Sequence, residues 1–172
     1  MQTFGGGQGW LKAGFLGFPK SGKSFTAALL ACELHRRMKL KKPVAFFDTE
    51  GGGEYVAPAI QKATGMQPIG MKSRALVDLL AVGRECEAGA AGILIADSIT
   101  HVWREVCDAY LKQVNEQLQR NGRGARTRLE FQDWQTIKAK WAAWTDFYLN
   151  SALHIIICGR AGYEWDFEEH ED

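Results

Sequence analysis

The sequence has few cysteines, few prolines and no excess charge of one sign. Its 172 residues include four scattered cysteines, none of them in a C-x-x-C pair, and four isolated histidines. This distribution favours reduced thiols and excludes a disulfide framework or a cysteine–histidine zinc site. The formal net charge is only +1, so any affinity for nucleic acid has to come from a local group of cations.

Long apolar runs are also missing. No stretch of 18 apolar residues occurs, so the sequence contains no candidate for a membrane-spanning helix. The N-terminus has no basic segment followed by an apolar one, so we expect no signal peptide. Together with the scattered thiols, these absences predict a cytoplasmic protein that has no membrane partner.

The chain does contain enough apolar material for one globular domain. Hydrophobic residues make up 46% of it and charged residues 24%, which is typical of globular domains. We expect the core to occupy residues 10–160. Residues 1–9, which are rich in glycine, are expected to be a flexible lead-in. Residues 161–172 are expected to form an acidic tail that leaves the core.

The most informative segment matches the phosphate-binding pattern G-x-x-x-x-G-K-[ST] at every fixed position. A strand is expected before it, over residues 11–18, and a helix after it, over residues 25–38. In such a loop, backbone N–H groups and the positive end of the following helix attract a phosphate. We expect Lys23 to reach the β- and γ-phosphates and the Ser24 hydroxyl to bind Mg²⁺, while Lys20 either adds charge or is solvated. The predicted nucleotide-binding residues are Gly17, Phe18, Pro19, Lys20, Ser21, Gly22, Lys23, Ser24 and Phe25.

The rest of the chain alternates between short buried strands and helices. Continuous apolar runs predict strands over residues 44–48, 92–97 and 154–159. Helical patterns occupy residues 54–64, 73–87 (with Ser73 as a possible N-cap), 100–119 and 130–150. This alternation predicts an α/β fold: a three-layer α/β/α sandwich around a mostly parallel sheet. Aromatic residues at helical spacing in the last helix are interpreted as core rather than as a base-stacking surface.

Polar residues follow several of these strands, at the edge where ligands bind in parallel sheets. Asp97 is positioned to hold Mg²⁺ opposite Ser24, although it could also cap the following helix. Glu50 is the candidate for orienting the attacking water, and its alternative is a solvated loop acid. Asp48 could serve as a structural hydrogen-bond acceptor. Arg160, at the tip of the last strand, is a candidate sensor of the γ-phosphate.

A group of arginines separates the last two helices. It consists of Arg120, Arg123, Arg126 and Arg128, with two glycines and no acidic residue among them. Guanidinium groups on a flexible segment suit a phosphate backbone, and such contacts weaken with salt. A solvated connection between helices is the alternative, and composition alone does not decide between the two.

In their order and spacing, these motifs resemble the RecA-like ATPases, and most closely the phage-encoded recombination ATPases associated with single-strand annealing. The resemblance covers residues 10–160 and rests on residues 17–24, 45–50, 93–98 and 155–160. It implies ATP and Mg²⁺ as cofactors, with Glu50 as the catalytic carboxylate. It also implies a polar sensor at Arg160, where RecA itself has glutamine, and a DNA-facing loop at Arg120–Arg128.

The resemblance also sets expectations for the whole protein. It implies single-stranded DNA as a partner, assembly into a ring or filament, and contact with an annealing protein or a single-strand-binding protein, in the host-cell cytoplasm if the gene belongs to a phage. RecA-like cores continue through further strands, so we expect this chain to be truncated at the C-terminal edge of its sheet.

Two other functions use the same phosphate-binding loop. One is a nucleotide-dependent assembly module in which hydrolysis has no role. The other is a nucleoside or small-molecule kinase, for which we recognise neither an arginine-bearing lid nor an acceptor pocket. The absence of an N-K-x-D motif argues against a signalling GTPase.

Overall fold

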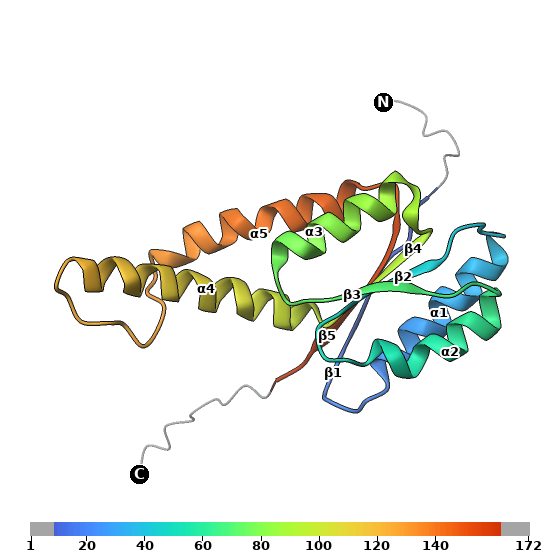
Figure 1. The fold of residues 1–172 in the computed structure, drawn as a ribbon, viewed down its shortest axis with the longest axis horizontal. Helices are drawn as coiled ribbons and strands as arrows, with labels where there is room; N and C mark the ends of the chain where they lie inside the picture. Colours follow the sequence, from blue (N-terminus) through green and yellow to red (C-terminus); the bar gives the residue numbers. More distant parts are fainter. Residues whose placement is uncertain (1–8, 163–172) are drawn as a thin grey trace, which may run out of the picture.

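The computed structural model describes residues 9–162 and contains a sheet of five parallel strands (Figure 1). The strand order is β1-β5-β4-β2-β3. The predicted α/β fold with a mostly parallel sheet is therefore confirmed, and in the described part of the chain every strand pair is parallel. The strands are β1 (Lys12–Gly17), β2 (Val44–Asp48), β3 (Ile69–Lys72), β4 (Ile93–Asp97) and β5 (His154–Arg160).

Helices connect the strands. Gly65 ends α2 with a φ of +73°, a left-handed conformation that glycine adopts readily. Among the described residues, no helix combines the length and the apolar character needed to cross a bilayer. The helices are α1 (Lys23–Arg37), α2 (Gly53–Thr64), α3 (Leu76–Glu85) with the short turn η1 (Cys86–Ala90), α4 (Ile99–Arg120) and α5 (Asp133–Asn150).

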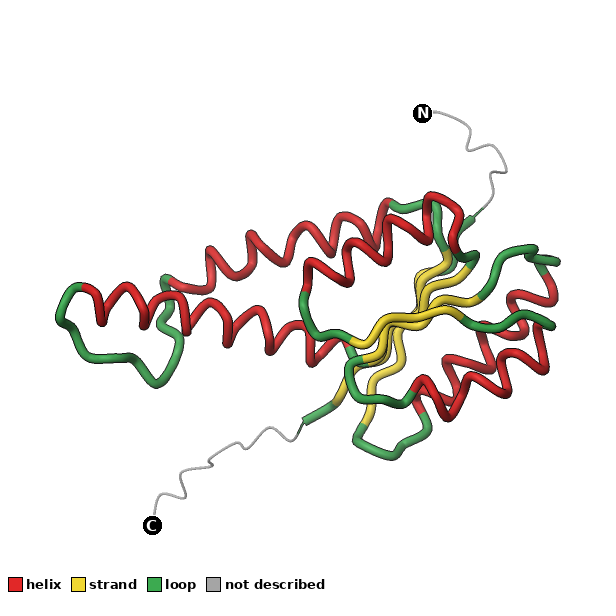
Figure 2. The backbone as a smooth tube through the Cα atoms, in the orientation of Figure 1, coloured by secondary structure: helices red, strands yellow, loops and turns green. Residues whose placement is uncertain are grey.

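The strand order explains why helices cover both faces of the sheet. From β1 to β2 and then β3 the chain moves toward one edge, and from β3 it returns to β4 and then β5. Because crossovers between parallel strands are right-handed, this reversal moves the later helices to the opposite face. Figure 2 shows the result: α1 and α2 lie on one side of the strands, and α3, α4 and α5 lie on the other. The described chain is thus arranged as helix, sheet and helix layers.

Two apolar clusters hold the layers together, one on each face of the sheet. Every residue of β2 and β4 is buried, as expected for central strands covered on both faces. Phe46 packs toward α1 and α2, whereas Phe47 packs toward α3, α4 and α5. Alternate side chains of one strand therefore anchor opposite helix layers.

One strand was not predicted, and two helices, α3 and α5, begin three residues later than predicted, α5 at Asp133. β3 was not expected, because its four exposed residues lie at the sheet edge and lack a continuous apolar run. The predicted helix over residues 73–87 begins only at Leu76 and passes into η1 after Glu85. Ser73 is not its N-cap: the Ser73 hydroxyl accepts the Ala75 N–H and donates to Asp78, which forms a turn ahead of the helix.

The α4–α5 hairpin projects beyond the sheet (Figure 1). Its helices contact each other through aromatic rings: Trp103 of α4 stacks on Trp134 at 6.4 Å between ring centroids and meets Trp141 edge-on at 5.0 Å. Trp144, farther along α5, is buried against the sheet. The aromatic stripe of α5 therefore packs within the protein, as interpreted from its helical period. The expected lead-in and tail fall largely on residues 1–8 and 163–172, outside the described residues.

Candidate functional site

The carboxyl ends of four strands meet at one edge of the sheet and frame a cleft. Strand register aligns Gly17 with Arg160 and Asp48 with Asp97. The cleft has a volume of about 570 Å³, within the range of small-ligand sites. Residues predicted separately from different parts of the sequence line it together: Lys20, Lys23, Ser24, Glu50, Asp97 and Arg160.

The loop between β1 and α1 has a backbone that only certain residues can adopt. Gly22 has a φ of +85° and Lys20 a φ of +65°, both in the left-handed region. A Cβ on Gly17 would lie 2.9 Å from the Ser21 hydroxyl oxygen, so the loop folds tightly over this position. The spacing of the two motif glycines therefore has a local structural reason.

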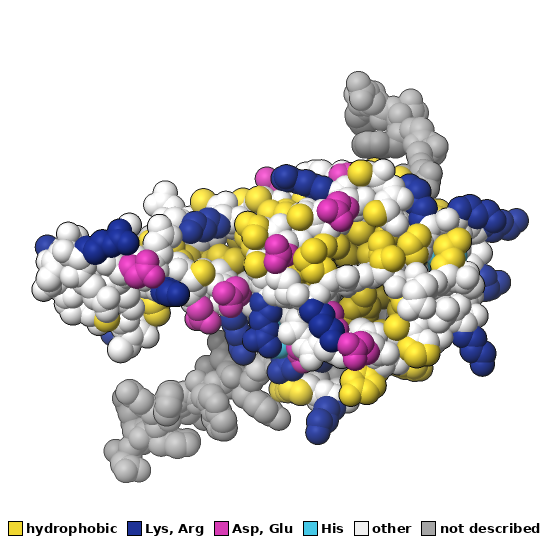
Figure 3. Space-filling view, in the orientation of Figure 1, with side chains coloured by type: hydrophobic (Ala, Val, Ile, Leu, Met, Phe, Trp, Pro, Cys, Tyr) yellow, Lys and Arg dark blue, Asp and Glu magenta, His cyan; other side chains and the backbone are white. Residues whose placement is uncertain are grey.

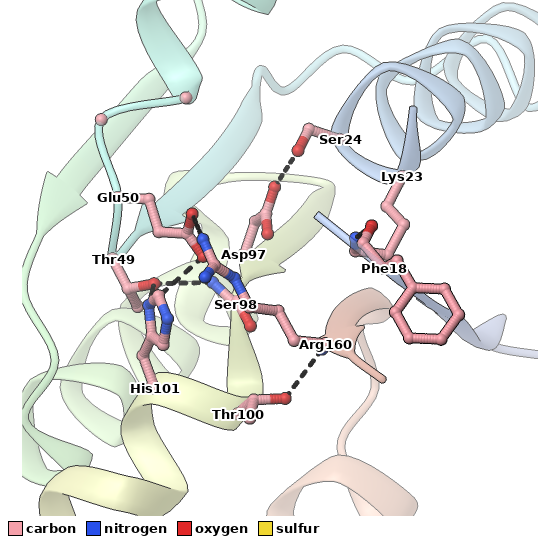
Figure 4. Close-up of polar contacts among 12 residues, drawn as sticks. Phe18, Lys23, Ser24, Thr49, Glu50, Asp97, Ser98, Thr100, His101 and Arg160 are labelled. Carbon is pink, nitrogen blue, oxygen red and sulfur yellow. Dashed lines mark hydrogen bonds and ion pairs between the residues drawn. The ribbon is translucent and has the colours of Figure 1, made fainter. Parts of the chain in front are cut away.

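The charged groups of this loop are arranged around the start of α1. The first turn of α1 has no acidic residue, and its N-cap is a glycine without a side-chain hydrogen bond, so no side chain of the helix itself neutralises its positive end. The Lys23 ammonium donates to the Phe18 carbonyl at 2.8 Å and lies 3.4 Å from the Ser21 hydroxyl. Lys23 thus folds back over the loop (Figure 4).

Ser24 and Asp97 contact each other across the cleft, where the Ser24 hydroxyl donates to a carboxylate oxygen of Asp97 (Figure 4). Burial raises the pKa of Asp97, and the nearby carboxylates Glu50 and Asp48 raise it further, while the Ser24 hydrogen bond opposes them. The Asp97 side chain does not cap α4. Ser98 occupies the N-cap position of that helix, also without a side-chain cap hydrogen bond.

A hydroxyl and a carboxylate facing each other are hard oxygen donors and fit Mg²⁺. No group of three or more histidine, cysteine or acidic side chains suited to a metal occurs within residues 9–162. Mg²⁺ is usually held by one or two protein oxygens, with phosphate and water completing its shell. The Ser24–Asp97 pair therefore suits a nucleotide-bound Mg²⁺ better than a metal held by protein side chains alone.

Asp48 organises the loop that carries Glu50. One of its carboxylate oxygens accepts the backbone N–H groups of Glu50 at 2.9 Å, Gly51 at 2.7 Å and Gly52 at 3.2 Å. The other oxygen accepts the Gly53 N–H at 2.8 Å, at the start of α2. Asp48 is buried and works as the structural acceptor that the sequence suggested. Its contacts hold the backbone around Glu50 in place.

Glu50 lies between a cation and an imidazole (Figure 4). Its Oε2 accepts a hydrogen bond from the Arg160 guanidinium, and its Oε1 lies 3.3 Å from the His101 Nδ1. The Arg160 backbone N–H donates to the Thr100 hydroxyl at 2.9 Å, which fixes the end of β5 against α4. Glu50 and Arg160 were predicted individually, but their pairing was not.

Two further residues of this site were missed by sequence reasoning. They are Thr49 and His101, and the Thr49 Oγ1 lies 2.9 Å from the His101 Nδ1. Thr49 is 7% exposed, and its hydroxyl also accepts the Ser98 N–H at 2.8 Å. No motif singles these residues out. The one available signal was position, because Thr49 precedes Glu50 and His101 lies in the first turn of α4, just after β4 ends at Asp97.

The arginine segment lies apart from the cleft, at the far end of α4. That helix has 22 residues and spans about 33 Å at 1.5 Å per residue. Arg120, Arg123 and Arg128 are exposed. Arg126 instead forms ion pairs with Glu130 at 2.8 Å and Asp133 at 2.7 Å, and only 19% of its side chain is accessible. These ion pairs account for Arg126 without a DNA ligand.

Comparison with known proteins adds no family assignment: no protein-family model matches the chain, and a search of curated proteins finds no match. Its function therefore has to be inferred from its own residues and their geometry.

Proposed function

We propose that this protein binds ATP with Mg²⁺ and hydrolyses it, as a RecA-like ATPase. The observation that supports the proposal is the shared cleft, in which Lys23, Ser24, Asp97, Glu50 and Arg160 come together from four separate segments. A glycine-rich turn that matched the motif by chance would not need a carboxylate opposite its serine or a second acid and a cation across the cleft.

Each residue has a distinct task in the proposed reaction. The loop N–H groups and Lys23 bind the phosphates, for which the Lys23 ammonium exchanges the Phe18 carbonyl for phosphate oxygens. Mg²⁺, held at Ser24 and Asp97, would neutralise charge on the β- and γ-phosphates. Glu50 orients a water molecule toward the γ-phosphorus and accepts its proton as the bond to the bridging oxygen breaks. Arg160 stabilises the negative charge on the γ-phosphate.

Single-stranded DNA is the proposed partner. The exposed arginines Arg120, Arg123 and Arg128 support this part of the proposal, because they present three guanidinium groups at the tip of a projecting hairpin. Assembly into a ring or filament and contact with an annealing or single-strand-binding protein belong to the same proposal and follow from the RecA-like resemblance.

The proposal is tested by comparing nucleotide binding with turnover. We expect Lys23→Ala to abolish binding of a fluorescent ATP analogue. We expect Glu50→Gln to keep binding and to slow hydrolysis by about 10²- to 10⁴-fold, the usual contribution of a general base. Normal turnover by the Glu50→Gln variant would refute the role of Glu50, and wild-type protein that binds no nucleotide would refute the whole proposal.

A second candidate function is a nucleotide-dependent assembly module without hydrolysis. The observation in its favour is that Arg160 already occupies the Oε2 of Glu50, one of the two oxygens that would have to accept the proton of the attacking water. Oligomer size measured by light scattering separates the two candidates. ATP-dependent assembly that is unchanged by Glu50→Gln, without phosphate release by the wild type, would favour the assembly module.

A further inference from the structure

The two carboxylate oxygens of Glu50 face different partners. Oε2 is paired with Arg160 from β5, and Oε1 lies 3.3 Å from the imidazole of His101 on α4 (Figure 4). Glu50 is 31% accessible at its side chain, so water reaches it from the cleft. The position of this carboxylate is therefore set by two groups from different elements.

The pairing with Arg160 conflicts with the proposed work of Glu50. The Arg160 guanidinium occupies Oε2, so this oxygen is not free to accept the proton of an attacking water. Arg160 also lines the cleft that holds Lys23 and Ser24. A γ-phosphate in that cleft offers the guanidinium group another acceptor, one with more negative charge that it can bind with two N–H groups. Nucleotide and Glu50 therefore compete for Arg160.

If Arg160 turns to a phosphate, only the His101 side of Glu50 keeps a partner. His101 is well anchored for this purpose, because its Nδ1 lies 2.9 Å from the Thr49 hydroxyl. Thr49 is fixed in turn by the Ser98 N–H on its hydroxyl at 2.8 Å and by its own N–H, which donates to the Asp97 carbonyl at 2.8 Å. An Nδ1–H on this imidazole can be donated either to Thr49 or to Glu50.

We propose that His101 is a positioning residue for Glu50. Arg160 holds the Glu50 carboxylate in the absence of nucleotide, and His101, anchored by Thr49, holds it once a γ-phosphate has taken Arg160. The exchange rests on the proposed ATPase function. The coupling between His101 and Glu50 does not, because it is a contact of the protein alone.

Several charged groups near His101 affect the pKa that a titration of its imidazole measures. Burial lowers the pKa of His101, the Glu50 carboxylate raises it, and the cations Arg160, Arg74 and Arg104 lower it. Arg74 is held nearby, since its Nε donates to the Thr49 carbonyl at 3.1 Å. Arg104 lies one helical turn from His101 on α4. Figure 3 shows Lys and Arg side chains gathered near the start of α4 and the end of β3.

The experiment follows the His101 imidazole by NMR as a function of pH. The chain has four histidines, so the His101 resonance is assigned by its loss in His101→Asn. Removal of Arg160 with Arg160→Ala imitates its departure without any nucleotide. We expect the His101 titration midpoint to move upward, because Glu50 then interacts with the imidazole alone. Arg160→Gln serves as a second variant that keeps more of the side-chain volume.

Arg160→Ala can shift the His101 titration in two ways: by freeing the Glu50 carboxylate, or by removing the repulsion between the Arg160 cation and the imidazolium. Repeating the measurement in the Glu50→Gln variant separates these two effects. In that background, Arg160→Ala removes only the repulsion between two cations, so we expect a smaller upward shift than with Glu50 present. Equal shifts in the two backgrounds would overturn the coupling. This comparison needs neither nucleotide nor activity, so it decides the matter even if the protein binds no ATP.

A non-hydrolysable ATP analogue with Mg²⁺ tests the exchange itself. We expect the analogue, but not ADP, to raise the His101 midpoint in the wild type, and to raise it less in Glu50→Gln. An analogue that binds with no shift would refute the exchange while leaving nucleotide binding intact. An analogue that does not bind would refute the proposed function and the exchange, but not the nucleotide-free coupling.

Single-turnover hydrolysis supplies the kinetic counterpart. His101→Leu removes the polar atoms of residue 101 that face Glu50, whereas His101→Asn keeps an amide near the position of Nδ1. We expect His101→Leu to slow hydrolysis about tenfold or more with unchanged analogue affinity, and His101→Asn to recover most of the rate. A wild-type rate in His101→Leu would show that the imidazole has no part in positioning Glu50.

Discussion

At the scale of single residues, Asp97 is held where ionisation is unfavourable. Its pKa is raised by burial and by the neighbouring carboxylates Glu50 and Asp48. A carboxyl group whose pKa is higher in the folded than in the unfolded state destabilises the protein as pH rises between the two values, and it continues to do so above them. A bound cation would relieve this cost. The ionised Asp97 carboxylate, which is suited to hold Mg²⁺, therefore destabilises the nucleotide-free protein.

We predict that Asp97→Asn stabilises the nucleotide-free protein while abolishing Mg²⁺-dependent nucleotide binding. At pH 7 the free energy of unfolding should rise by about 0.5–2 kcal/mol, the usual gain from relieving a strained functional site. The gain should shrink as pH falls through the raised pKa of the folded state and should vanish below the ordinary pKa of an aspartate, where both states are protonated. Urea unfolding at neutral and acidic pH measures this difference. A less stable Asp97→Asn variant at neutral pH would contradict the prediction.

Asp48 gives a second prediction, because one carboxylate serves four backbone N–H groups. Asp48→Ala leaves these donors without their acceptor and should lower the free energy of unfolding by about 3 kcal/mol. Asp48→Asn keeps one carbonyl oxygen and should cost less. Both variants should slow ATP hydrolysis more than they weaken nucleotide binding, since the displaced loop carries Glu50. Denaturation midpoints and single-turnover rates measure the two effects, and an unchanged Asp48→Ala protein would refute the structural role.

At the scale of elements, the α4–α5 hairpin separates structural from exposed arginines. Arg126 pairs with Glu130 and Asp133 inside the hairpin. The backbone N–H of Glu130, followed by the Arg126 guanidinium, holds the pKa of Asp133 below its usual range. The exposed residues Arg120, Arg123 and Arg128 form no ion pair within the described part of the chain. The same segment thus combines a cation that shapes the connection with cations that face solvent.

We predict different outcomes for these arginines in single-stranded DNA binding. Arg120→Ala, Arg123→Ala and Arg128→Ala should each weaken binding and reduce the salt dependence, by about 0.7 in the slope of log K against log salt for each lost phosphate contact. Arg126→Ala should mainly lower the thermal stability of the hairpin. Fluorescence anisotropy at several salt concentrations, with circular dichroism as the stability control, measures both. If the salt dependence of binding is unchanged in all three variants, the hairpin does not contact the DNA phosphates.

Much of the element pattern was predictable from the sequence. The strands β2, β4 and β5 follow from continuous apolar runs, β1 follows from its interrupted apolar run ahead of the phosphate-binding motif, and the period of α4 and α5 follows from their aromatic residues. β3 was not predictable, because a four-residue edge strand with an exposed glycine gains its order from pairing with β2 rather than from its own pattern. The late start of α3 was missed for a related reason: Ser73 forms a local turn with Asp78 instead of a cap.

At the scale of the whole molecule, the cleft joins segments from most of the sheet. Its residues follow β1, β2, β4 and β5, so a ligand there touches the carboxyl ends of four strands. These strands pack against both helix layers through the two apolar clusters. Binding in the cleft should therefore stabilise the whole fold and not only the loop.

We predict that Mg²⁺ and a non-hydrolysable ATP analogue raise the unfolding midpoint in a concentration-dependent way. The stabilisation should approach about 2.7 kcal/mol when the ligand is at a hundred times its dissociation constant. Differential scanning fluorimetry over a range of analogue concentrations measures this shift. Lys23→Ala is the matched control and should show none of it. An equal shift in Lys23→Ala would indicate that the analogue binds elsewhere.

The phosphate-binding motif, the alternation of strands and helices, and the candidate residues Glu50, Asp97 and Arg160 could all be recognised from the amino-acid sequence alone. Those features are local, because they depend on spacing within a loop or on the period of one element. Only the tertiary structure decided that Arg160 meets a carboxylate 110 residues away, that His101 and Thr49 join it, and that Arg126 belongs to the hairpin interior. Such contacts depend on strand order and helix packing, which bring distant segments together, and no local pattern in the sequence encodes which side chains will then touch.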